Sequence, residues 1–347
     1  MKIAPLMEAY IAYPSIKPVL VHTGQHYDVN MSDLFFKELN IPAPDIFLNV
    51  GSDTQARQVA KIMIAFEEVC MKEKPDAIMV AGDVNSTMAC SLVAVKLGIK
   101  IIHLEAGLRS YDRNMPEEIN RVVTDLLADI LLIPSLDAKS NLQNEGITDE
   151  KIFFVGNIMI DTLCKFLPVI HKSAICKDLG LKQKEFILVT LHRPSNVDEV
   201  INLEPILKTL HKISGNTKIV MPLHPRTRKN ITRFGLDHYL SSIILTEPLG
   251  YFDFQKLMVS SKCVITDSGG VQEETTFLKI PCITVRENTE RPVSVTTGSN
   301  VVIGNNMQKL EACLNSVLMN KWKSSNIPDL WDGKTAGRVI EVLIKTI

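Results

Sequence analysis

The stretch Val264-Ile265-Thr266-Asp267-Ser268-Gly269-Gly270-Val271-Gln272-Glu273-Glu274 decides the fold of the second half of this chain. An apolar run stops at Asp267 and helix-forming residues follow two glycines, which predicts a strand, a tight turn and a helix start. The first N–H groups of a helix have no partners within it and lie at the positive end of its dipole. Glycines let a phosphate approach that backbone, so the pattern favours a nucleotide diphosphate site; an ordinary turn is the alternative.

The same alternation of apolar, β-rich runs and amphipathic segments extends over all 347 residues. It predicts βα units around parallel sheets. Because one core rarely grows beyond about 250 residues, we expect two domains. One covers 1–158, a second covers 159–330, and a helix in 331–347 packs back across the domain junction. The fold class is therefore α/β, with two doubly wound Rossmann-like domains facing a cleft.

The individual elements follow from the apolar periods. We expect strands at 18–22, 77–81, 100–104, 130–133, 152–155, 186–191, 217–221, 243–246, 262–266, 281–285 and 301–303. We expect helices at 30–38, 54–73, 86–97, 117–127, 137–144, 159–167, 199–213, 252–260, 271–278 and 307–319.

Composition limits the classes of partner. A net charge of −1 gives no basic field that would attract nucleic acid or an anionic membrane. The basic cluster at Arg226, Arg228, Lys229 and Arg233 is expected to be a solvated face. The seven cysteines have no metal-site spacing and suit the reduced thiols of a cytoplasmic protein. No apolar run reaches the roughly 20 residues of a membrane span.

Three carboxylates stand at predicted strand ends or just beyond them. Asp83 follows the strand 77–81, Glu105 follows the strand 100–104, and Glu117 lies in the motif Met-Pro-Glu-Glu-Ile-Asn-Arg. In an open α/β sheet such strand ends face the ligand crevice. Carboxylates gathered in a cleft acquire altered proton affinities and serve as acid and base.

Each carboxylate also has a structural alternative. Asp83 could cap the helix that begins near Ser86, and Asn114 could be the N-cap of a helix with Glu117 at its third position. Glu105 ends a buried strand, where a carboxylate needs a partner such as Arg109 or Arg121.

The second domain offers cationic and hydrogen-bonding groups. His192 and Arg193 end one strand, His224 ends another, and Arg291 lies in a later loop. These side chains suit a diphosphate, although a single histidine is more often structural. A metal site is not expected, because Thr23 and Gly24 break any helix that would pair His22 with His26.

Taken in order, these segments resemble the non-hydrolysing UDP-N-acetylglucosamine 2-epimerases. The resemblance covers essentially the whole chain and is carried by residues 23–28, 82–83, 105–109, 115–121, 156–157, 192–193, 224–225, 266–274 and 289–292. It implies a glycosyltransferase-B type fold, a homodimer, and no metal or nicotinamide cofactor. It also implies interconversion of UDP-N-acetylglucosamine and UDP-N-acetylmannosamine at C2, through elimination and re-addition of UDP.

The resemblance also implies roles for single residues. Asp83 and Glu117 would be the acid–base pair, with Glu105 as an orienting or sugar-binding carboxylate. The substrate-binding residues would be Lys2, His192, Arg193, His224, Phe254 at the uracil pocket, Ser268, Gly269, Gly270, Glu274 at the ribose, and Arg291. Gln25, His26 and Arg57 resemble an activator site that some bacterial relatives use for a second UDP-N-acetylglucosamine.

The resemblance departs at the N-terminus. Residues 1–6 correspond to the inside of the family's first helix, so a central strand and an arginine that contacts the ligand are missing. We expect a start placed too far downstream or a trimmed sequence, and poor folding or little activity of residues 1–347. Four alternatives stay open: a UDP-sugar-dependent glycosyltransferase, an epimerase of a different 2-acetamido UDP-sugar, a hydrolysing epimerase, and a non-catalytic binding protein.

Overall fold

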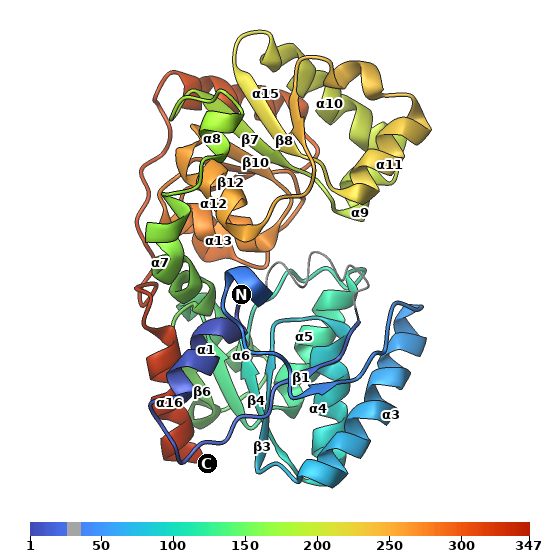
Figure 1. Cartoon of the computed structure of the whole chain (residues 1–347), viewed down its shortest axis with the longest axis vertical. Helices are drawn as coiled ribbons and strands as arrows, with labels where there is room; N and C mark the ends of the chain where they lie inside the picture. Colours follow the sequence, from blue (N-terminus) through green and yellow to red (C-terminus); the bar gives the residue numbers. More distant parts are fainter. Residues whose placement is uncertain (26–35) are drawn as a thin grey trace. The chain divides into compact units, whose positions relative to one another are not determined.

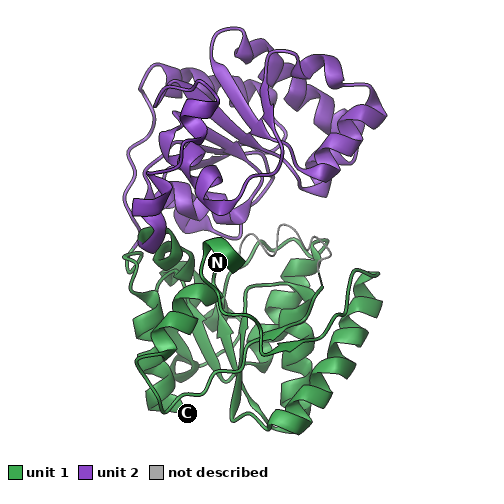
Figure 2. Cartoon of the chain, viewed as in Figure 1, with its two compact units in different colours: residues 1–164, 329–347 green, residues 165–328 purple. Residues whose placement is uncertain are grey.

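A computed structural model describes residues 1–25 and 36–347, which form two compact units (Figure 2). Unit 1 comprises residues 1–164 and 329–347, and unit 2 comprises residues 165–328. The sequence placed the divisions at 158/159 and 330/331, near these positions. The first division falls inside a continuous helix, α7 (Ile158–Ile170), where no loop marks it. The last helix, α16 (Thr335–Thr346), packs against α1 (Ile3–Tyr10) in unit 1.

Unit 1 contains a four-stranded parallel sheet of order β3-β4-β5-β6 and a separate parallel pair, β1-β2 (Figure 1). In the described part of the chain no backbone ladder joins the pair to the larger sheet. The strands are β1 (Val21–His22), β2 (Ile46–Phe47), β3 (Ala77–Ala81), β4 (Lys100–Leu104), β5 (Ile130–Ile133) and β6 (Ile152–Phe154). The helices that follow strands or precede them are α3 (Gln55–Glu73), α4 (Asn85–Leu97), α5 (Pro116–Leu127), α6 (Leu136–Asn144) and the short 3₁₀ turn η1 (Asp149–Lys151).

Unit 2 contains a six-stranded parallel sheet of order β12-β11-β10-β7-β8-β9, the doubly wound arrangement predicted from the sequence. Its strands are β7 (Phe186–Thr190), β8 (Lys218–Pro222), β9 (Ile244–Thr246), β10 (Cys263–Thr266), β11 (Cys282–Thr284) and β12 (Asn300–Val302). Its helices are α8 (Ile175–Asp178), α9 (Pro194–Val197), α10 (Val200–Ser214), α11 (Pro225–Phe234), η2 (Asp237–Leu240), α12 (Tyr251–Ser260), α13 (Gly269–Phe277), α14 (Pro292–Thr296) and α15 (Met307–Leu318).

Each sheet is apolar on both faces because helices cover both. Along β7, Ile187 and Val189 belong to one core cluster, whereas Phe186 and Leu188 belong to the cluster on the other face. This two-residue period within a continuous apolar run is what a buried parallel strand requires. The strand C-termini of each sheet therefore lie at one edge, where the connecting turns carry polar side chains.

Several elements differ from the sequence prediction, which did not include β2, α8, α9 or α14. The strand predicted at 18–22 shortens to β1, since the N–H of Leu20 donates to the Asp45 side chain (2.7 Å). Helix α11 was not predicted; it carries the basic cluster on its outer side. The predicted helix 30–38 lies mostly outside the described residues.

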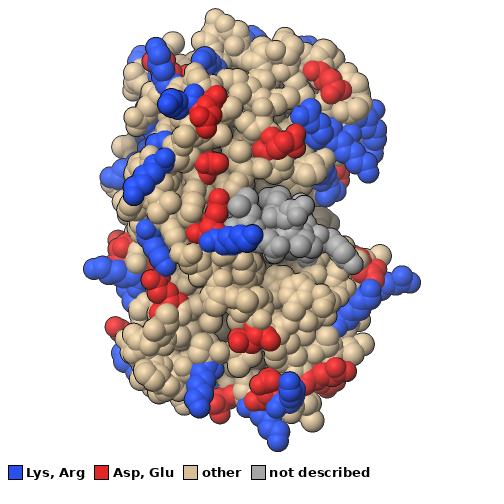
Figure 3. All heavy atoms as spheres, in the orientation of Figure 1, with Lys and Arg blue, Asp and Glu red and all other residues tan. Residues whose placement is uncertain are grey.

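Surface charge is mixed, as the net charge requires. Figure 3 shows lysine and arginine together with aspartate and glutamate on the visible face of each unit. None of the helices in the described residues is long and apolar enough to cross a membrane.

A substitution at Gly156 tests how closely residues 329–347 pack against the rest of unit 1. Its φ is +91°, and a Cβ there would overlap the carbonyl of Leu330. Gly146 is a matched control, because its φ is +85° but a Cβ there would meet nothing within 4 Å. Both alanine variants incur the cost of a left-handed residue, about 1 kcal/mol. We expect Gly156→Ala to lower the free energy of unfolding by about 3 kcal/mol or more in urea titrations. Equal losses in the two variants would contradict this packing.

Candidate active site

The glycine turn in unit 2 leads into a helix whose N-terminus is open. Helix α13 begins at Gly269, two residues earlier than predicted, and the N-cap Ser268 makes no side-chain cap bond. The first N–H groups therefore receive no bond from Ser268, and they lie at the positive end of the helix dipole, where an anion is stabilised. A Cβ on Gly269 would lie 2.5 Å from a terminal guanidinium nitrogen of Arg291, so the close approach of this side chain requires glycine.

Asp267, directly before this turn, organises the neighbouring loop. Strands β7 and β10 are adjacent at the centre of the sheet, where the strand order reverses. The buried Asp267 carboxylate accepts hydrogen bonds from the N–H groups of His192 (2.9 Å) and Arg193 (2.8 Å), and its second oxygen lies 2.8 Å from Nδ1 of His192. Burial acts to raise the pKa of Asp267, but these bonds outweigh it and hold the pKa below its ordinary value. The structure therefore brings His192 and Arg193 to the start of α13.

His224 joins the same edge from β8. It is the N-cap of α11, its Nδ1 accepts from the N–H of Arg226 (3.2 Å), and its ring lies 5.6 Å from that of His192. Burial, together with the neighbouring His192, lowers its pKa. A neutral ring that accepts at Nδ1 carries its hydrogen on Nε2, which makes it a donor for a phosphate oxygen.

Arg291 is held in a buried cluster of four charges. Its Nε lies 2.9 Å from Glu273, one of its terminal nitrogens donates to Glu290, and Glu290 also binds Arg286 at 2.7 Å. All four residues are at most 7% exposed. Two arginines and two glutamates balance, so the guanidinium is fixed beside Gly269 without a net buried charge.

Glu274 lies in the second turn of α13 and is buried. The hydroxyl of Tyr251 donates to it (3.3 Å), and burial raises its pKa to about 7. Phe254, one turn after Tyr251 on α12, is half-buried against the same core cluster as Val271. The residues assigned to nucleotide binding thus share one edge of the sheet and the two helices beside it.

In unit 1 the turns after β3 and β4 bring Asp83, Glu105 and Lys2 together. Lys2 precedes α1, and its Nζ lies 2.6 Å from Glu105. A Cβ on Gly82 would lie 2.5 Å from that nitrogen and 3.9 Å from Glu105 Oε2, which places the Gly82–Asp83 turn against the pair. The second Glu105 oxygen is buried and has no hydrogen-bond partner among the described residues. Glu105 also has a φ of +68°, an unfavourable value that here turns the chain after β4.

Helix α5 connects the third carboxylate to this group. Glu117 is half-buried in its first turn, and Arg121, one turn later, donates from Nε to Asp83 (3.2 Å). Asn120 donates to the Asp83 carbonyl (2.9 Å). The adjacent Glu118 is buried and accepts from Ser110, Tyr111 and Arg121. Glu118 therefore braces the loop before α5, whereas Glu117 stays at its surface.

Several structural alternatives from the sequence are wrong. Asp83 does not cap α4, whose N-cap is Val84. Asn114 does not cap α5, because Met115 is its N-cap and Pro116 its first residue. The partner of Glu105 is neither predicted arginine. Arg109 binds Asp125 and Glu145, and Arg121 binds Asp83 and Glu118, so the cation at Glu105 is Lys2.

The residues of the suggested activator site are only partly described. His26 lies outside the described residues. Gln25 is buried, and its side chain accepts from the N–H of Ser86 (3.1 Å) at the start of α4. Arg57 is exposed on α3, next to Gln58, which donates to the Gln25 carbonyl (3.0 Å).

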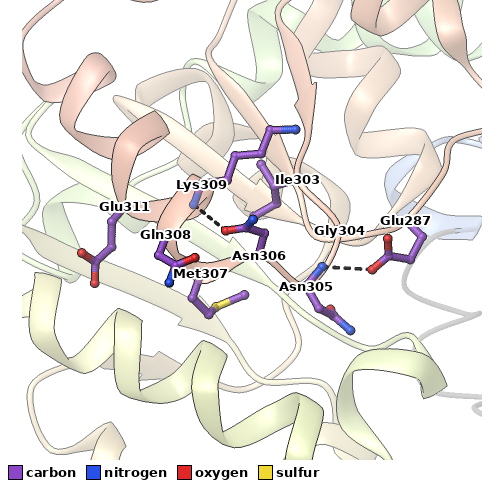
Figure 4. Close-up of a pocket in the computed structure, with 9 residues that line it drawn as sticks. All are labelled: Glu287, Ile303, Gly304, Asn305, Asn306, Met307, Gln308, Lys309 and Glu311. Carbon is purple, nitrogen blue, oxygen red and sulfur yellow. Dashed lines mark hydrogen bonds between the residues drawn. The ribbon is translucent and has the colours of Figure 1, made fainter.

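A separate open pocket lies at the start of α15 (Figure 4). Glu287 accepts from the N–H of Asn305 (3.1 Å) there, and Asn306 caps the helix by accepting from the N–H of Lys309 (2.8 Å). Glu287 and Glu311 give its lining two carboxylates, a poor match to a diphosphate. Among the described residues no group of three or more histidine, cysteine, aspartate or glutamate side chains is arranged to hold a metal ion.

The fold and these two groups of residues define a two-domain α/β protein of the glycosyltransferase-B type. Residues 9–344 match the family model described as UDP-N-acetylglucosamine 2-epimerase. The chain belongs to that family, and the resemblance inferred from its motifs is confirmed.

Individual relatives agree over nearly the whole chain. A UDP-N-acetylglucosamine 2-epimerase of Methanocaldococcus jannaschii is 41% identical, over 99% of this chain and 95% of the relative. The crystal structure of the Methanocaldococcus jannaschii enzyme with UDP-N-acetylglucosamine and UDP has a TM-score of 0.92, with 41% identity, and covers 99% and 96% of the two chains. A UDP-2,3-diacetamido-2,3-dideoxy-D-glucuronate 2-epimerase of Pseudomonas aeruginosa is 42% identical over 87% and 84%.

Sequence reasoning missed the buried residues that hold these groups in place. The sequence pattern places Asp267 in a turn but does not predict that its carboxylate holds the loop at His192 and Arg193. Its position between a strand and two glycines was a signal. Asp125 gave no such signal, because its partners His103 and Arg109 lie far from it in the sequence.

Proposed function

We propose that this chain interconverts UDP-N-acetylglucosamine and UDP-N-acetylmannosamine by inverting C2 of the hexose. The observation that carries the proposal is the membership of an epimerase family together with three acidic side chains at or beside the strand ends of unit 1. A glycosyltransferase would need an acceptor site instead of proton carriers, and the relatives above are epimerases.

The chemistry explains the division of labour between the units. The C2 hydrogen of a sugar is barely acidic, so direct deprotonation is implausible. If the C1–O bond breaks with its electron pair going to the diphosphate, positive charge develops at C1 and the C2 proton becomes removable. Its loss forms a C1–C2 double bond, which gives a glycal and UDP. Protonation of C2 on the opposite face and re-addition of UDP to C1 then give the epimer.

Unit 2 is suited to the departing UDP. The open N-terminus of α13 and the Nε2–H of His224 donate to diphosphate oxygens as negative charge develops. Ser268, Gly269, Gly270, His192 and Arg193 provide the surrounding contacts. Arg291 provides a fixed cation on the phosphate or sugar side, and Phe254 lines the uracil pocket. Glu274 accepts hydrogen bonds from the ribose.

Unit 1 is suited to the proton transfers. We assign Asp83 and Glu117 as the acid–base pair. Glu105, held by Lys2 and with one buried oxygen left over, orients the sugar. Arg121 donates from Nε to one oxygen of Asp83, which fixes the direction of that carboxylate.

We also propose that the enzyme acts as a homodimer in the cytoplasm, that it needs neither metal nor organic cofactor, and that Gln25, His26 and Arg57 contribute to an activator site. All seven cysteines are free thiols, as a reducing compartment favours. Light scattering tests the dimer, and sigmoidal against hyperbolic kinetics tests the activator site.

Incubation with UDP-N-acetylglucosamine in deuterated water tests the reaction. We expect UDP-N-acetylmannosamine to form with deuterium at C2, because the departing proton exchanges with solvent. NMR measures this incorporation of deuterium. A parallel assay with the diacetamido-glucuronate UDP-sugar compares the two substrates. Free N-acetylmannosamine with UDP would indicate a hydrolysing enzyme, and a sugar without deuterium would contradict the proposal.

The acid–base assignment predicts a separation of turnover from binding. Asp83→Asn and Glu117→Gln should each lower kcat by about 100-fold or more, because they remove a proton carrier. Calorimetry should show UDP binding within about twofold of the parent, since UDP contacts belong to unit 2. Glu118→Gln is not a neutral control here, because Glu118 binds Arg121. Loss of UDP binding in the first two variants would show that these residues belong to the nucleotide site.

Glu274 predicts a pH dependence of nucleotide affinity. The ionised Glu274 carboxylate accepts hydrogen bonds from both ribose hydroxyls, and the pKa of Glu274 is about 7. The affinity for the nucleotide should therefore rise about fourfold between pH 6.5 and 8.5, as this carboxyl group ionises. UDP-glucose is a suitable probe because its diphosphate does not titrate there. The pKa of His224 is lowered from its ordinary value by burial, which favours the neutral ring over this range. Glu274→Gln should remove the rise; an affinity that falls with pH, or a rise that persists in the variant, would contradict the ribose contact.

A further inference from the structure

A second group of charges lies behind the carboxylates of unit 1, and the proposed mechanism does not use it. His103 on β4 and Asp125 on α5 are completely buried, and Arg109 is 3% exposed. Arg109 continues the group to Glu145 at the end of α6, with two bonds of 2.7 and 2.6 Å. The group thus connects three elements of unit 1.

Asp125 binds the chain on both sides of Glu105. One carboxylate oxygen lies 2.5 Å from Nδ1 of His103, two residues before Glu105. The other accepts from the N–H of Gly107 (3.0 Å), two residues after it, and from a terminal nitrogen of Arg109 (2.6 Å). Glu105 itself has the unfavourable φ of +68°. A residue persists in that conformation when the surrounding structure fixes it, and Asp125 supplies such restraints on both flanks.

His103 extends the same restraint to the turn that carries Asp83. Its Nε2 lies 2.8 Å from the carbonyl oxygen of Gly82. The N–H of Gly82 donates to the carbonyl of Leu104 (2.9 Å), so both polar groups of this peptide segment are tied to β4. One imidazole therefore links the residue before Asp83 to the helix that carries Glu117 and Arg121.

The partners of His103 define its hydrogen positions. A carbonyl oxygen only accepts, so Nε2 donates to Gly82. Burial acts to raise the pKa of Asp125, but its contacts with His103 and Arg109 outweigh burial and hold the pKa below its ordinary value. Arg109, which also binds Glu145, offsets the buried charge of Asp125.

The other charged side chains near His103 form ion pairs with one another. Lys2 binds Glu105, and Arg121 binds Asp83 and Glu118. Within the described residues, the contacts of His103 that carry charge are therefore confined to Asp125.

We propose that His103 and Asp125 are positioning residues for the epimerisation, because together they fix the turns that carry Asp83 and Glu105. The inference rests on the proposed function and deepens it. Neither side chain needs to touch the substrate. Their loss should lower turnover by displacing the acid–base groups, because a displacement of about 1 Å from reacting geometry costs about 100-fold in rate.

Two substitutions at His103 each keep one of its two hydrogen bonds and remove the other. His103→Asn places an amide nitrogen near the Nδ1 position, so it keeps a donor for Asp125 and loses the bond to Gly82. His103→Gln places the amide nitrogen near Nε2, so it keeps a donor for Gly82 and loses the bond to Asp125. Asp125→Asn removes the charge of the anchor while keeping its shape. Thr124→Val is the matched control, since Thr124 is the buried neighbour on α5 and its hydroxyl has no hydrogen-bond partner among the described residues.

The experiment measures epimerisation, UDP affinity and thermal unfolding of each full-length variant. We expect kcat to fall about 100-fold in His103→Asn and in Asp125→Asn, about tenfold in His103→Gln, and less than about twofold in Thr124→Val. KM and UDP affinity should stay within about twofold of the parent. Should Asp125→Asn fail to fold, the contrast between the two His103 variants decides. A kcat unchanged in both His103 variants, or parallel losses of kcat and UDP affinity, would overturn the proposal.

The hydrogen positions give a readout that does not depend on activity. In ¹⁵N-histidine-labelled protein, the imidazole whose signals vanish in His103→Asn should carry a hydrogen on Nε2, because that nitrogen donates to the carbonyl of Gly82. A His103 ring without a hydrogen on Nε2 would contradict the bond to Gly82. An inactive parent enzyme would refute the proposed function, and with it this role. An active parent with unaffected His103 variants would refute the positioning role alone.

Discussion

The three hydrogen bonds and ion pairs that converge on Asp125 are the interaction on which the site in unit 1 depends. The turn after β4 is joined to β5 only through Leu132, whose carbonyl accepts from the N–H groups of Glu105 and Ala106 (both 3.1 Å), and it contains a non-glycine residue with positive φ. A buried carboxylate that accepts from a side chain, a backbone N–H and a guanidinium fixes such a turn more rigidly than apolar packing does, because each bond has a direction. The cost of burying the charge is offset only if all partners are present, so losing one partner is expensive, about 3–5 kcal/mol.

Unit 2 solves the same problem with Asp267. This carboxylate is also fully buried, also contacts a histidine, and binds the backbone N–H groups of His192 and Arg193 on the neighbouring loop. In unit 2 the aspartate itself connects two neighbouring strand ends, whereas in unit 1 Asp125 holds the end of β4 and His103 makes the connection to the carbonyl of Gly82 after β3. Figure 1 shows how the parallel strands of each unit direct their C-termini to one edge. The sheets bring the functional turns to that edge, and the buried aspartates fix their conformation.

Much of this architecture could be predicted from the residues. The strand, glycine turn and helix at 264–274 specified β10 and α13 because apolar runs and glycines act locally. The ordered motifs identified the family, and Asp83, Glu105 and Lys2 do come together in unit 1. The ion-pair partners of the charged residues were not predicted correctly. Glu105 binds Lys2 instead of either arginine, and Glu273 holds Arg291, because ion pairs between distant residues leave no periodic pattern in a sequence. Caps were also misassigned, since Pro116 fixes the start of α5 one residue after Met115 regardless of the nearby asparagine.

The central claim is that the first N–H groups of α13 bind the diphosphate and that Asp83 and Glu117 act at C2 of the hexose. A crystal structure of this chain with UDP-N-acetylglucosamine tests it most directly. The account predicts diphosphate oxygens bound by the first N–H groups of α13, and a carboxylate oxygen of Asp83 or Glu117 within about 3.5 Å of the hexose C2. A diphosphate bound away from α13, or a hexose from which both carboxylates point away, would contradict it.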